Sequence, residues 1–156
     1  MTPTAIIAID PGPKESACVI FDGKTISYHA KLSNDTVAKN LSDGQRGYGW
    51  AYPCIIEWIE GYGKTVGNEI FHTCRWVGRF EQAAGGATLI TRKQIKQHLC
   101  DSLQAKDTHI RAALIDRFGE PGTRKKPGPT YGIVGDEWSA LAVAVVFWDT
   151  HDPPRA

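Results

Sequence analysis

The sequence of 156 residues lacks the features that mark several classes of protein. Its four cysteines (Cys18, Cys54, Cys74 and Cys100) have no Cys-x-x-Cys spacing, so we expect neither a disulfide framework nor a structural zinc. No apolar run approaches the roughly 20 residues that span a bilayer. No positively charged, apolar signal segment stands at the start, and we therefore expect a cytosolic protein.

A strong charge of either sign is also lacking. The formal net charge of +1 neither requires nor excludes a nucleic-acid partner, so the placement of the basic residues matters more than their sum. No internal repeat, low-complexity segment or long linker divides the chain. Its hydrophobic content of 42% is enough for one sizeable core, and we expect a single domain over residues 1–156.

The most informative stretch runs from Ile6 to Gly12. Four apolar residues are followed by Asp10, Pro11 and Gly12, which predicts a buried strand that ends in a carboxylate and a turn. Apolar runs at 17–21 and 25–28 flank an Asp-Gly pair, a strong hairpin signal, and complete an antiparallel meander of three strands. Asp10 is either a functional carboxylate or simply a turn former.

A second carboxylate interrupts the apolar run of residues 54–59. An unpaired buried carboxylate is costly, so Glu57 must pair, become protonated or bind a cation. A salt bridge to Arg75 or Arg79 is the structural alternative to a functional role. Glu60 is a rival carboxylate, but it falls on the opposite face of the predicted strand.

Helices account for most of the remaining chain. Residues 66–84 carry an apolar stripe against the sheet, made of Ile70, Phe71, Cys74, Val77 and Phe80. We also expect a short helix over 35–41, a loop with aromatic residues over 44–53, a strand over 87–90, and helices over 92–103 and 107–118.

Basic residues gather in the second half of the chain. The polar faces of the two helices expected over 92–103 and 107–118 carry Arg92, Lys93, Lys96, Lys106, Arg111 and Arg117, although a charged helix face is usually just solvated. The run from Gly119 to Gly132 differs, because Arg124, Lys125 and Lys126 stand there between prolines and glycines. We expect a flexible basic loop of this kind to bind phosphates of a nucleic acid.

The last predicted helix covers residues 136–148 and is apolar almost all round, so it should be buried. Asp136 could serve as its N-cap. Yet Asp10, Glu57 and Asp136 would converge on one site, where they repel one another unless a divalent cation lies between them. Oxygen ligands suit Mg²⁺ or Mn²⁺, and two such ions about 4 Å apart activate water against a phosphodiester.

These landmarks together resemble one known family. Ile9-Asp10-Pro11-Gly12, Ile56-Glu57, Lys93-Gln94-Ile95-Lys96 followed by Ala105-Lys106-Asp107, and Asp136 leading into Ala140-Leu141-Ala142-Val143-Ala144 look like the RuvC-type Holliday junction resolvases of the ribonuclease H-like superfamily. The similarity covers most of the chain in order. Within the family, this chain looks most like the compact phage-encoded members.

The resemblance implies an α/β fold with a mixed five-stranded sheet flanked by helices, a homodimer, and metal-dependent nicking of branched DNA. It makes Asp10, Glu57 and Asp136 metal ligands, with Ser139 where the family usually has a further aspartate. It places Lys96 and Lys106 near phosphates. The full set expected to contact DNA is Lys93, Lys96, Lys106, Arg111, Arg124, Lys125 and Lys126.

We therefore expect a Mg²⁺- or Mn²⁺-dependent endonuclease that acts on Holliday junctions or other branched DNA, in the cytoplasm of a bacterium or of a phage-infected cell. In this hypothesis, Lys96 offsets charge that develops on the phosphate. The alternatives are a related enzyme that acts on RNA/DNA hybrids and a DNA-binding module without catalytic activity. A sugar-kinase or actin-like ATPase needs two such domains, for which 156 residues are too few.

Overall fold

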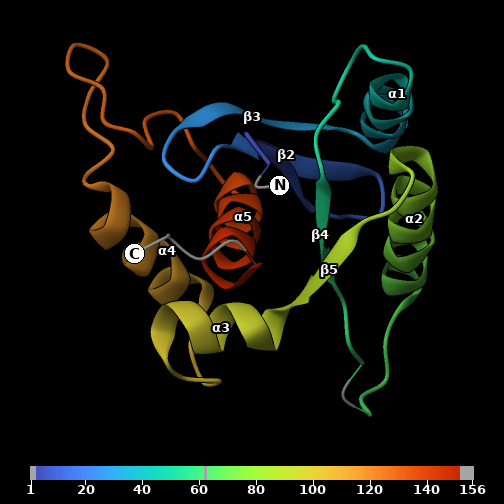
Figure 1. Cartoon of the computed structure of the whole chain (residues 1–156). Coiled ribbons are helices and arrows are strands. Elements are labelled where there is room, and N and C mark those ends of the chain that lie inside the picture. Colours follow the sequence, from blue (N-terminus) through green and yellow to red (C-terminus); the bar gives the residue numbers. More distant parts are fainter. Residues whose placement is uncertain (1–2, 62, 152–156) are drawn as a thin grey trace.

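The computed structural model describes residues 3–61 and 63–151, which form one five-stranded sheet with five helices packed around it (Figure 1). In chain order the elements are β1 (Ile6–Asp10), β2 (Glu15–Phe21), β3 (Ile26–Ser33), α1 (Asn34–Gln45), β4 (Cys54–Trp58), α2 (Asn68–Ala84), β5 (Thr88–Thr91), α3 (Arg92–Cys100), α4 (Asp107–Phe118) and α5 (Glu137–His151).

The sheet has the strand order β3-β2-β1-β4-β5, with β1 at its centre. β1, β2 and β3 pair antiparallel, which confirms the predicted meander, whereas β4 and β5 add to β1 in parallel. The mixed five-stranded sheet expected from the sequence is therefore confirmed.

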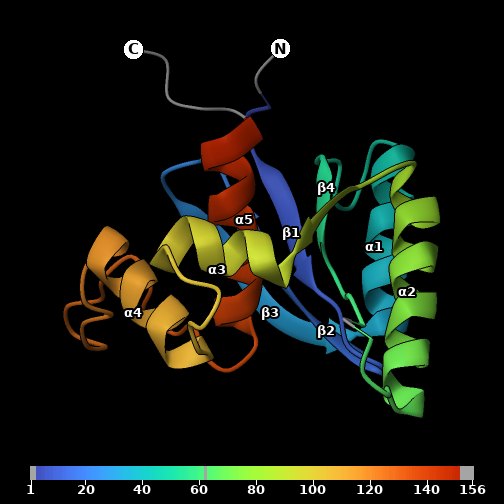
Figure 2. The same cartoon turned by 90° about the horizontal axis from the view of Figure 1, so that it is seen from below.

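The two faces of the sheet carry different helices (Figure 2). Ile6 and Ala8 point toward the face covered by α5, α3 and α4, while Ile7 and Ile9 point toward α1 and α2. All four side chains are fully buried. This explains the apolar run without alternation, because β1 is covered on both faces.

α5 is buried along most of its length, as its uniformly apolar sequence predicts. Three alanines, Ala140, Ala142 and Ala144, are fully buried, and such small side chains let the helix pack closely on the sheet.

No helix among residues 3–61 and 63–151 is long and apolar enough to cross a membrane.

Asp149, near the end of α5, links that helix to α3 and α4. Its carboxylate accepts hydrogen bonds from Arg117 of α4 at 2.6 Å and pairs with His98 of α3 at 2.7 Å. Burial raises the pKa of Asp149, but the bonds from Arg117 and His98 outweigh it and hold the pKa below its ordinary value. The three helices thus form one layer behind the sheet.

Several helix boundaries differ from the sequence prediction. α5 begins at Glu137 and runs to His151, one turn beyond the predicted end at residue 148. α1 continues past residue 41 to Gln45 and includes Gly44, where we expected a loop. The glycine at this position packs closely against the backbone of Trp50, which leaves no room for a side chain. α2 begins at Asn68 rather than at residue 66. α3 stops at Cys100 rather than at Leu103, because Asp101 adopts the left-handed conformation that ends a helix.

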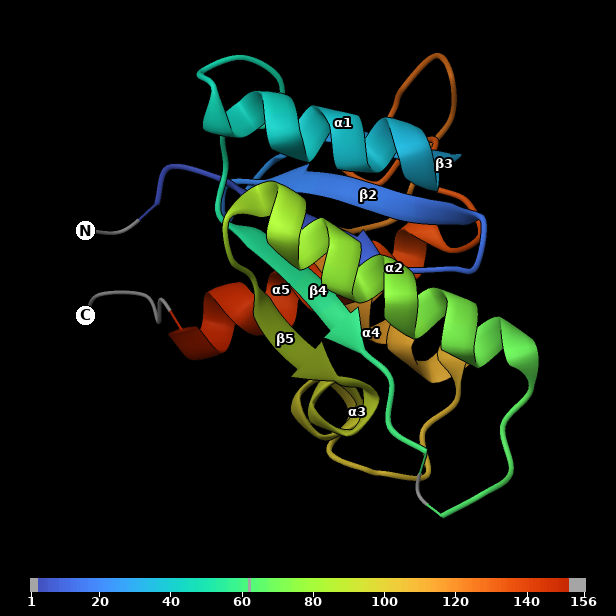
Figure 3. The ribbon, with the colours of Figure 1, turned by 90° about the vertical axis from the view of Figure 1, so that its right-hand side faces the viewer.

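The predicted apolar stripe of α2 is only partly correct. Val77 and Phe80 are buried against the sheet, but the third buried residue is Thr73, and Phe71 is 62% exposed. Figure 3 shows α2 beside α1 on one face of the sheet. Phe71 is nine residues before Phe80, which is about half a turn around the helix, so it lies on the side that faces away from the sheet.

Candidate active site

Asp10 and Glu57 stand side by side at the ends of two neighbouring parallel strands. Ile9 of β1 pairs with Ile56 of β4, and each strand continues with its carboxylate. Ile55 packs in the cluster around α5, so Glu57, two residues further, points to the same face. Asp10 follows Ala8 onto that face in the same way.

The third carboxylate belongs to the residue that precedes α5, on the same face of the sheet. Asp136 accepts a hydrogen bond from Lys31 Nζ of β3 at 2.8 Å. Its neighbour Glu137 contacts His29 Nδ1, also of β3, at 2.5 Å. Two side chains of β3 therefore hold the start of α5 in place, and the carboxylate of Asp136 is engaged by a lysine.

The electrostatics of Asp10 show that the three carboxylates influence one another. Burial, followed by the charges of Glu57 and Asp136, raises the pKa of Asp10 from 3.8 to about 8, against the opposing effects of Arg92 and Lys31. Without a cation, Asp10 therefore holds a proton at neutral pH. A carboxyl group with such a perturbed pKa at a strand end is typical of a functional site.

Glu57 is only partly compensated. Burial raises its pKa, Arg92 lowers it, and Asp136 raises it further. Arg92 Nη1 lies 3.6 Å from Glu57 Oε1, which is too long for a good hydrogen bond, and the same guanidinium pairs directly with Asp107. Oε1 is buried and accepts no hydrogen bond from the described residues.

The arginine beside Glu57 is therefore neither of the two that the sequence offered for a structural salt bridge. Arg75 and Arg79 both belong to α2, which covers the opposite face of the sheet from Glu57. Arg79 stacks instead on Trp76 of its own helix, 3.9 Å from the ring centroid. Glu60 is exposed and lies beyond the end of β4.

The donor set fits a hard divalent cation. A buried carboxylate oxygen without a hydrogen-bond donor, next to a carboxyl group whose pKa is raised by two others, is the environment that a cation would stabilise. No three Asp, Glu, His or Cys side chains within the described ranges are gathered closely enough to hold an ion. Lys31 and Arg92 supply positive charge to Asp136 and Glu57.

Two hollows open on either side of Asp136. One, of about 420 Å³, is lined by Gly12, Lys14, Lys31 and His72. The other, of about 270 Å³, lies toward α4 and is lined by Arg92, Asp107, Arg111, Trp138 and Ser139. Ser139 thus faces the same hollow as Asp136, one helical turn after it, as the sequence spacing requires.

The predicted DNA contacts fall into separate places. Arg111 lines the hollow beside Asp136, whereas Lys93 lines a cavity near the C-terminal end of α5 with Val146 and His151, at the far end of that helix. Lys96 is half-buried on α3, and Lys106 is exposed at the start of α4, where its backbone N–H donates to His109 at 2.9 Å. Of these four, Arg111 is the one that shares a hollow with Asp136.

The basic loop between α4 and α5 projects beside α4, away from the sheet (Figure 1). We expected no strand in it, but Gly122 and Pro127 form an isolated antiparallel bridge. Thr123 and Lys126 exchange backbone hydrogen bonds at 3.1 Å, which places Arg124 and Lys125 at the tip of a tight turn. All three basic residues are exposed.

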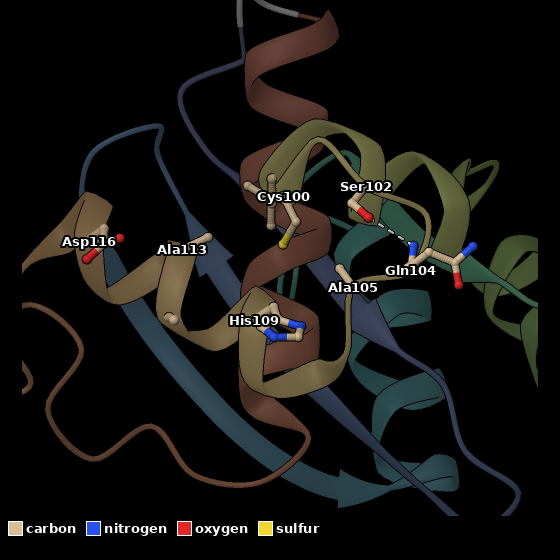
Figure 4. A pocket seen from close by; sticks show the side chains of 9 residues that line it. Cys100, Ser102, Gln104, Ala105, His109, Ala113 and Asp116 are labelled. Atoms are coloured by element: carbon tan, nitrogen blue, oxygen red, sulfur yellow. Dashed lines mark hydrogen bonds between the residues drawn. The ribbon is translucent and has the colours of Figure 1, made fainter.

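A further cavity, of about 480 Å³, lies between α3 and α4 (Figure 4). Cys100, Ser102, His109 and Asp116 contribute to its lining, and none of the residues predicted for the site belongs to it. It is therefore distinct from the carboxylate site.

Sequence reasoning missed Lys31 and the link between Arg92 and Glu57. Lys31 alternates with partly buried residues along β3, and its position two residues from His29 puts both on the face of α5. A basic residue on the inner face of an edge strand was the available signal. Arg92 directly follows β5, whose residue Ile90 pairs with Glu57, but that register is visible only in the fold.

The mixed five-stranded sheet with helices on both faces is a RuvC-like α/β fold. Among solved structures, Thermus thermophilus RuvC in complex with a Holliday junction substrate has a TM-score of 0.69 and 15% sequence identity, covering 96% of this chain and 97% of that one. A second structure of Thermus thermophilus RuvC has a TM-score of 0.66 and 14% identity, covering 94% and 96%.

Comparison at the level of sequence gives no further support. No protein-family model matches the chain, and no curated protein matches it. The likeness to RuvC is thus one of fold, and it confirms the fold that the sequence landmarks predicted.

Proposed function

We propose that this protein is a metal-dependent, structure-selective endonuclease that cleaves Holliday junctions or other branched DNA by phosphodiester hydrolysis. The observation that carries the proposal is the placement of Asp10, Glu57 and Asp136 on one face of a RuvC-like fold, where the first two are largely buried and electrostatically strained. Strained carboxylates at adjoining strand ends are more useful for holding cations than for stability.

Asp10, Glu57 and Asp136 would hold Mg²⁺ or Mn²⁺, in two ions, with the Ser139 hydroxyl as a neutral neighbour. Bound ions of this kind supply Lewis-acid activation of water and neutralise charge on the phosphate. The buried Glu57 Oε1 supports the assignment, because it otherwise lacks a partner among the described residues.

The other charged residues would serve the substrate. Lys31 and Arg92 balance Asp136 and Glu57 in the cation-free protein and become available to phosphates once cations replace them. Lys96 is proposed to offset charge on the phosphate that reacts, while Lys93, Lys106, Arg111 and the basic loop bind the backbone of the DNA. The cytoplasm of a bacterium or of a phage-infected cell stays the predicted place of action.

A homodimer is part of the proposal. A four-way junction has two-fold symmetry, and paired cuts across it need two sites. The exposed Phe71 on α2 gives apolar surface on the side of the sheet opposite α5, which a second copy would cover.

A comparison of four substrates tests the proposal. The purified protein should cut a four-way junction in Mg²⁺ or Mn²⁺ faster than a flap, a linear duplex or an RNA/DNA hybrid. Preferential cleavage of the hybrid would favour a ribonuclease H activity instead. Tight junction binding without cleavage in either ion would show a DNA-binding module that lacks catalysis.

A further inference from the structure

The hollow between α4 and the start of α5 is rich in hydrogen-bond donors. Arg92, Arg111, Trp138 and Ser139 line it, together with the carboxylates of Asp107 and Asp136. The guanidinium groups, the indole N–H and the hydroxyl can all donate to one acceptor. The question is which ligand these donors fit.

The carboxylates of this hollow are already compensated. Asp107 pairs with Arg92, and Asp136 pairs with Lys31 at 2.8 Å. Arg111 differs, because it forms no ion pair with any carboxylate within residues 3–61 and 63–151. Its guanidinium lies over the ring of Trp138, 4.9 Å from the centroid, which orients the group without neutralising its charge. Arg111 is therefore the cation of this hollow that no carboxylate of the described residues neutralises.

Trp138 adds an independent observation. The residue is only 6% exposed, and its indole Nε1 is buried without a hydrogen-bond acceptor in the part of the chain that the structure describes. Buried indole N–H groups usually have a partner, and an unpaired one destabilises the fold. Trp138 lines the hollow, and an acceptor seated beneath Arg111 would satisfy this N–H once a small movement of the ring exposed it.

We propose that this hollow binds one phosphodiester group of the substrate strand, next to the group that is cleaved. Arg111 would grip two of its oxygens with its forked donors, with the Trp138 N–H and the Ser139 hydroxyl as further donors. Asp136 belongs both to the hollow and to the carboxylate site, so the two phosphates are neighbours on one strand. This inference rests on the proposed function and assigns the path of the strand past the carboxylates.

A methylphosphonate scan tests the assignment, because each methylphosphonate removes the charge of a single linkage. Binding is measured with Ca²⁺ in place of Mg²⁺, on four-way junctions neutralised one linkage at a time around the cleaved bond. We expect a loss of affinity of about tenfold at one linkage beside that bond in the wild-type protein. Arg111→Met should lose a similar factor on the unmodified junction and lose nothing more at that linkage.

Two further variants sharpen the result. Trp138→Phe keeps the ring but removes the N–H, and should reduce the effect at the same linkage. Arg79→Met is the matched control, because Arg79 also stacks on a tryptophan but on the opposite face of the sheet, and it should respond to every linkage as the wild type does. Thermal unfolding of each variant confirms that it is folded.

The outcomes separate this inference from the proposed function. Suppose that the wild type cuts the junction, but that every neutral linkage lowers the affinity of Arg111→Met by the same factor as it lowers that of the wild type. The phosphate then does not lie in this hollow. An effect of Trp138→Phe at a different linkage from that of Arg111→Met would also overturn the assignment. If the wild type neither binds nor cuts branched DNA, the proposed function itself fails, and this inference fails with it.

Discussion

Lys31 Nζ lies 2.8 Å from Asp136 Oδ2, so that the edge strand β3 supplies a positive charge to the carboxylate at the start of α5. In a similar way, Arg92 Nη1 lies 3.6 Å from Glu57 Oε1. Both side chains are therefore internal cations at a site whose carboxylates would otherwise repel one another. In the proposed enzyme they must give way when a divalent cation binds.

Lys31→Met should strengthen the binding of divalent cations. Without the lysine, Asp136 has no competing positive partner, so we expect the dissociation constant for Mn²⁺ to fall by about threefold to tenfold. Isothermal titration calorimetry with Mn²⁺ measures it. Lys39→Met is the matched control, because Lys39 pairs with Asp43 on α1, on the other face of the sheet. Equal affinities in Lys31→Met and in the wild type would show that Lys31 does not compete for Asp136.

The stability of the cation-free protein should fall as the pH rises. The pKa of Asp10 is about 8 in the fold and 3.8 in its ordinary state, so between these values the folded protein binds more protons than the unfolded chain. The free energy of unfolding therefore decreases across pH 4 to 8. Asp10→Asn should flatten this dependence and, at pH 8 in EDTA, be more stable than the wild type by on the order of 1–3 kcal/mol. Urea titrations at pH 5 and pH 8 measure both effects, and parallel slopes in the two proteins would refute the raised pKa.

The replacement of Arg124, Lys125 and Lys126 by alanine should weaken binding to branched and linear DNA alike. These exposed cations should contact backbone phosphates without reading sequence. The slope of log affinity against log salt concentration should therefore become less steep by up to about 0.9 for each contact that is lost. The rate of the chemical step at saturation should change little. An unaltered salt slope would mean that the loop faces away from DNA and that the helix faces around Lys96 and Arg111 make the contact.

Phe71→Ser should shift the proposed dimer toward monomers. The side chain is 62% exposed on α2, and its loss removes apolar surface that a second copy would cover. Light scattering over a range of concentrations reports the mass. Leu103→Ser, on a side chain that is 49% exposed outside α2, is the control and should leave the mass unchanged. A fully active wild-type monomer at assay concentrations would contradict the dimer.

Much of the fold could be predicted from local patterns. The run Ile6 to Ile9 is apolar without alternation because β1 is buried on both faces, and the Asp-Gly pair at 22–23 marks the β2–β3 hairpin. The ends of helices were harder, because α1 continues through Gly44, whose close packing against Trp50 no local pattern reveals.

The carboxylates of the site could be predicted, but their partners could not. Asp10 and Glu57 interrupt apolar strands, and that is visible in the sequence. Arg92 reaches Glu57 only because β5 pairs with β4, and Lys31 reaches Asp136 only because β3 lies beside the start of α5. These contacts join residues 35 and 105 positions apart, so no spacing rule could find them. Arg75 and Arg79 were the wrong candidates because α2 packs on the other face.

The three carboxylates are the centre of the account, and a cleavage assay on their amide variants tests it most directly. Asp10→Asn, Glu57→Gln and Asp136→Asn should each cut a four-way junction in Mg²⁺ at less than about one hundredth of the wild-type rate, while junction binding is kept or improved, because each change removes negative charge that repels phosphate. Glu60→Gln, at an exposed carboxylate just beyond β4, is the control and should cut normally. EDTA should stop the wild-type enzyme. If any of the three variants cuts at a rate near that of the wild type, that carboxylate does not hold a catalytic cation, and the proposed site is wrong.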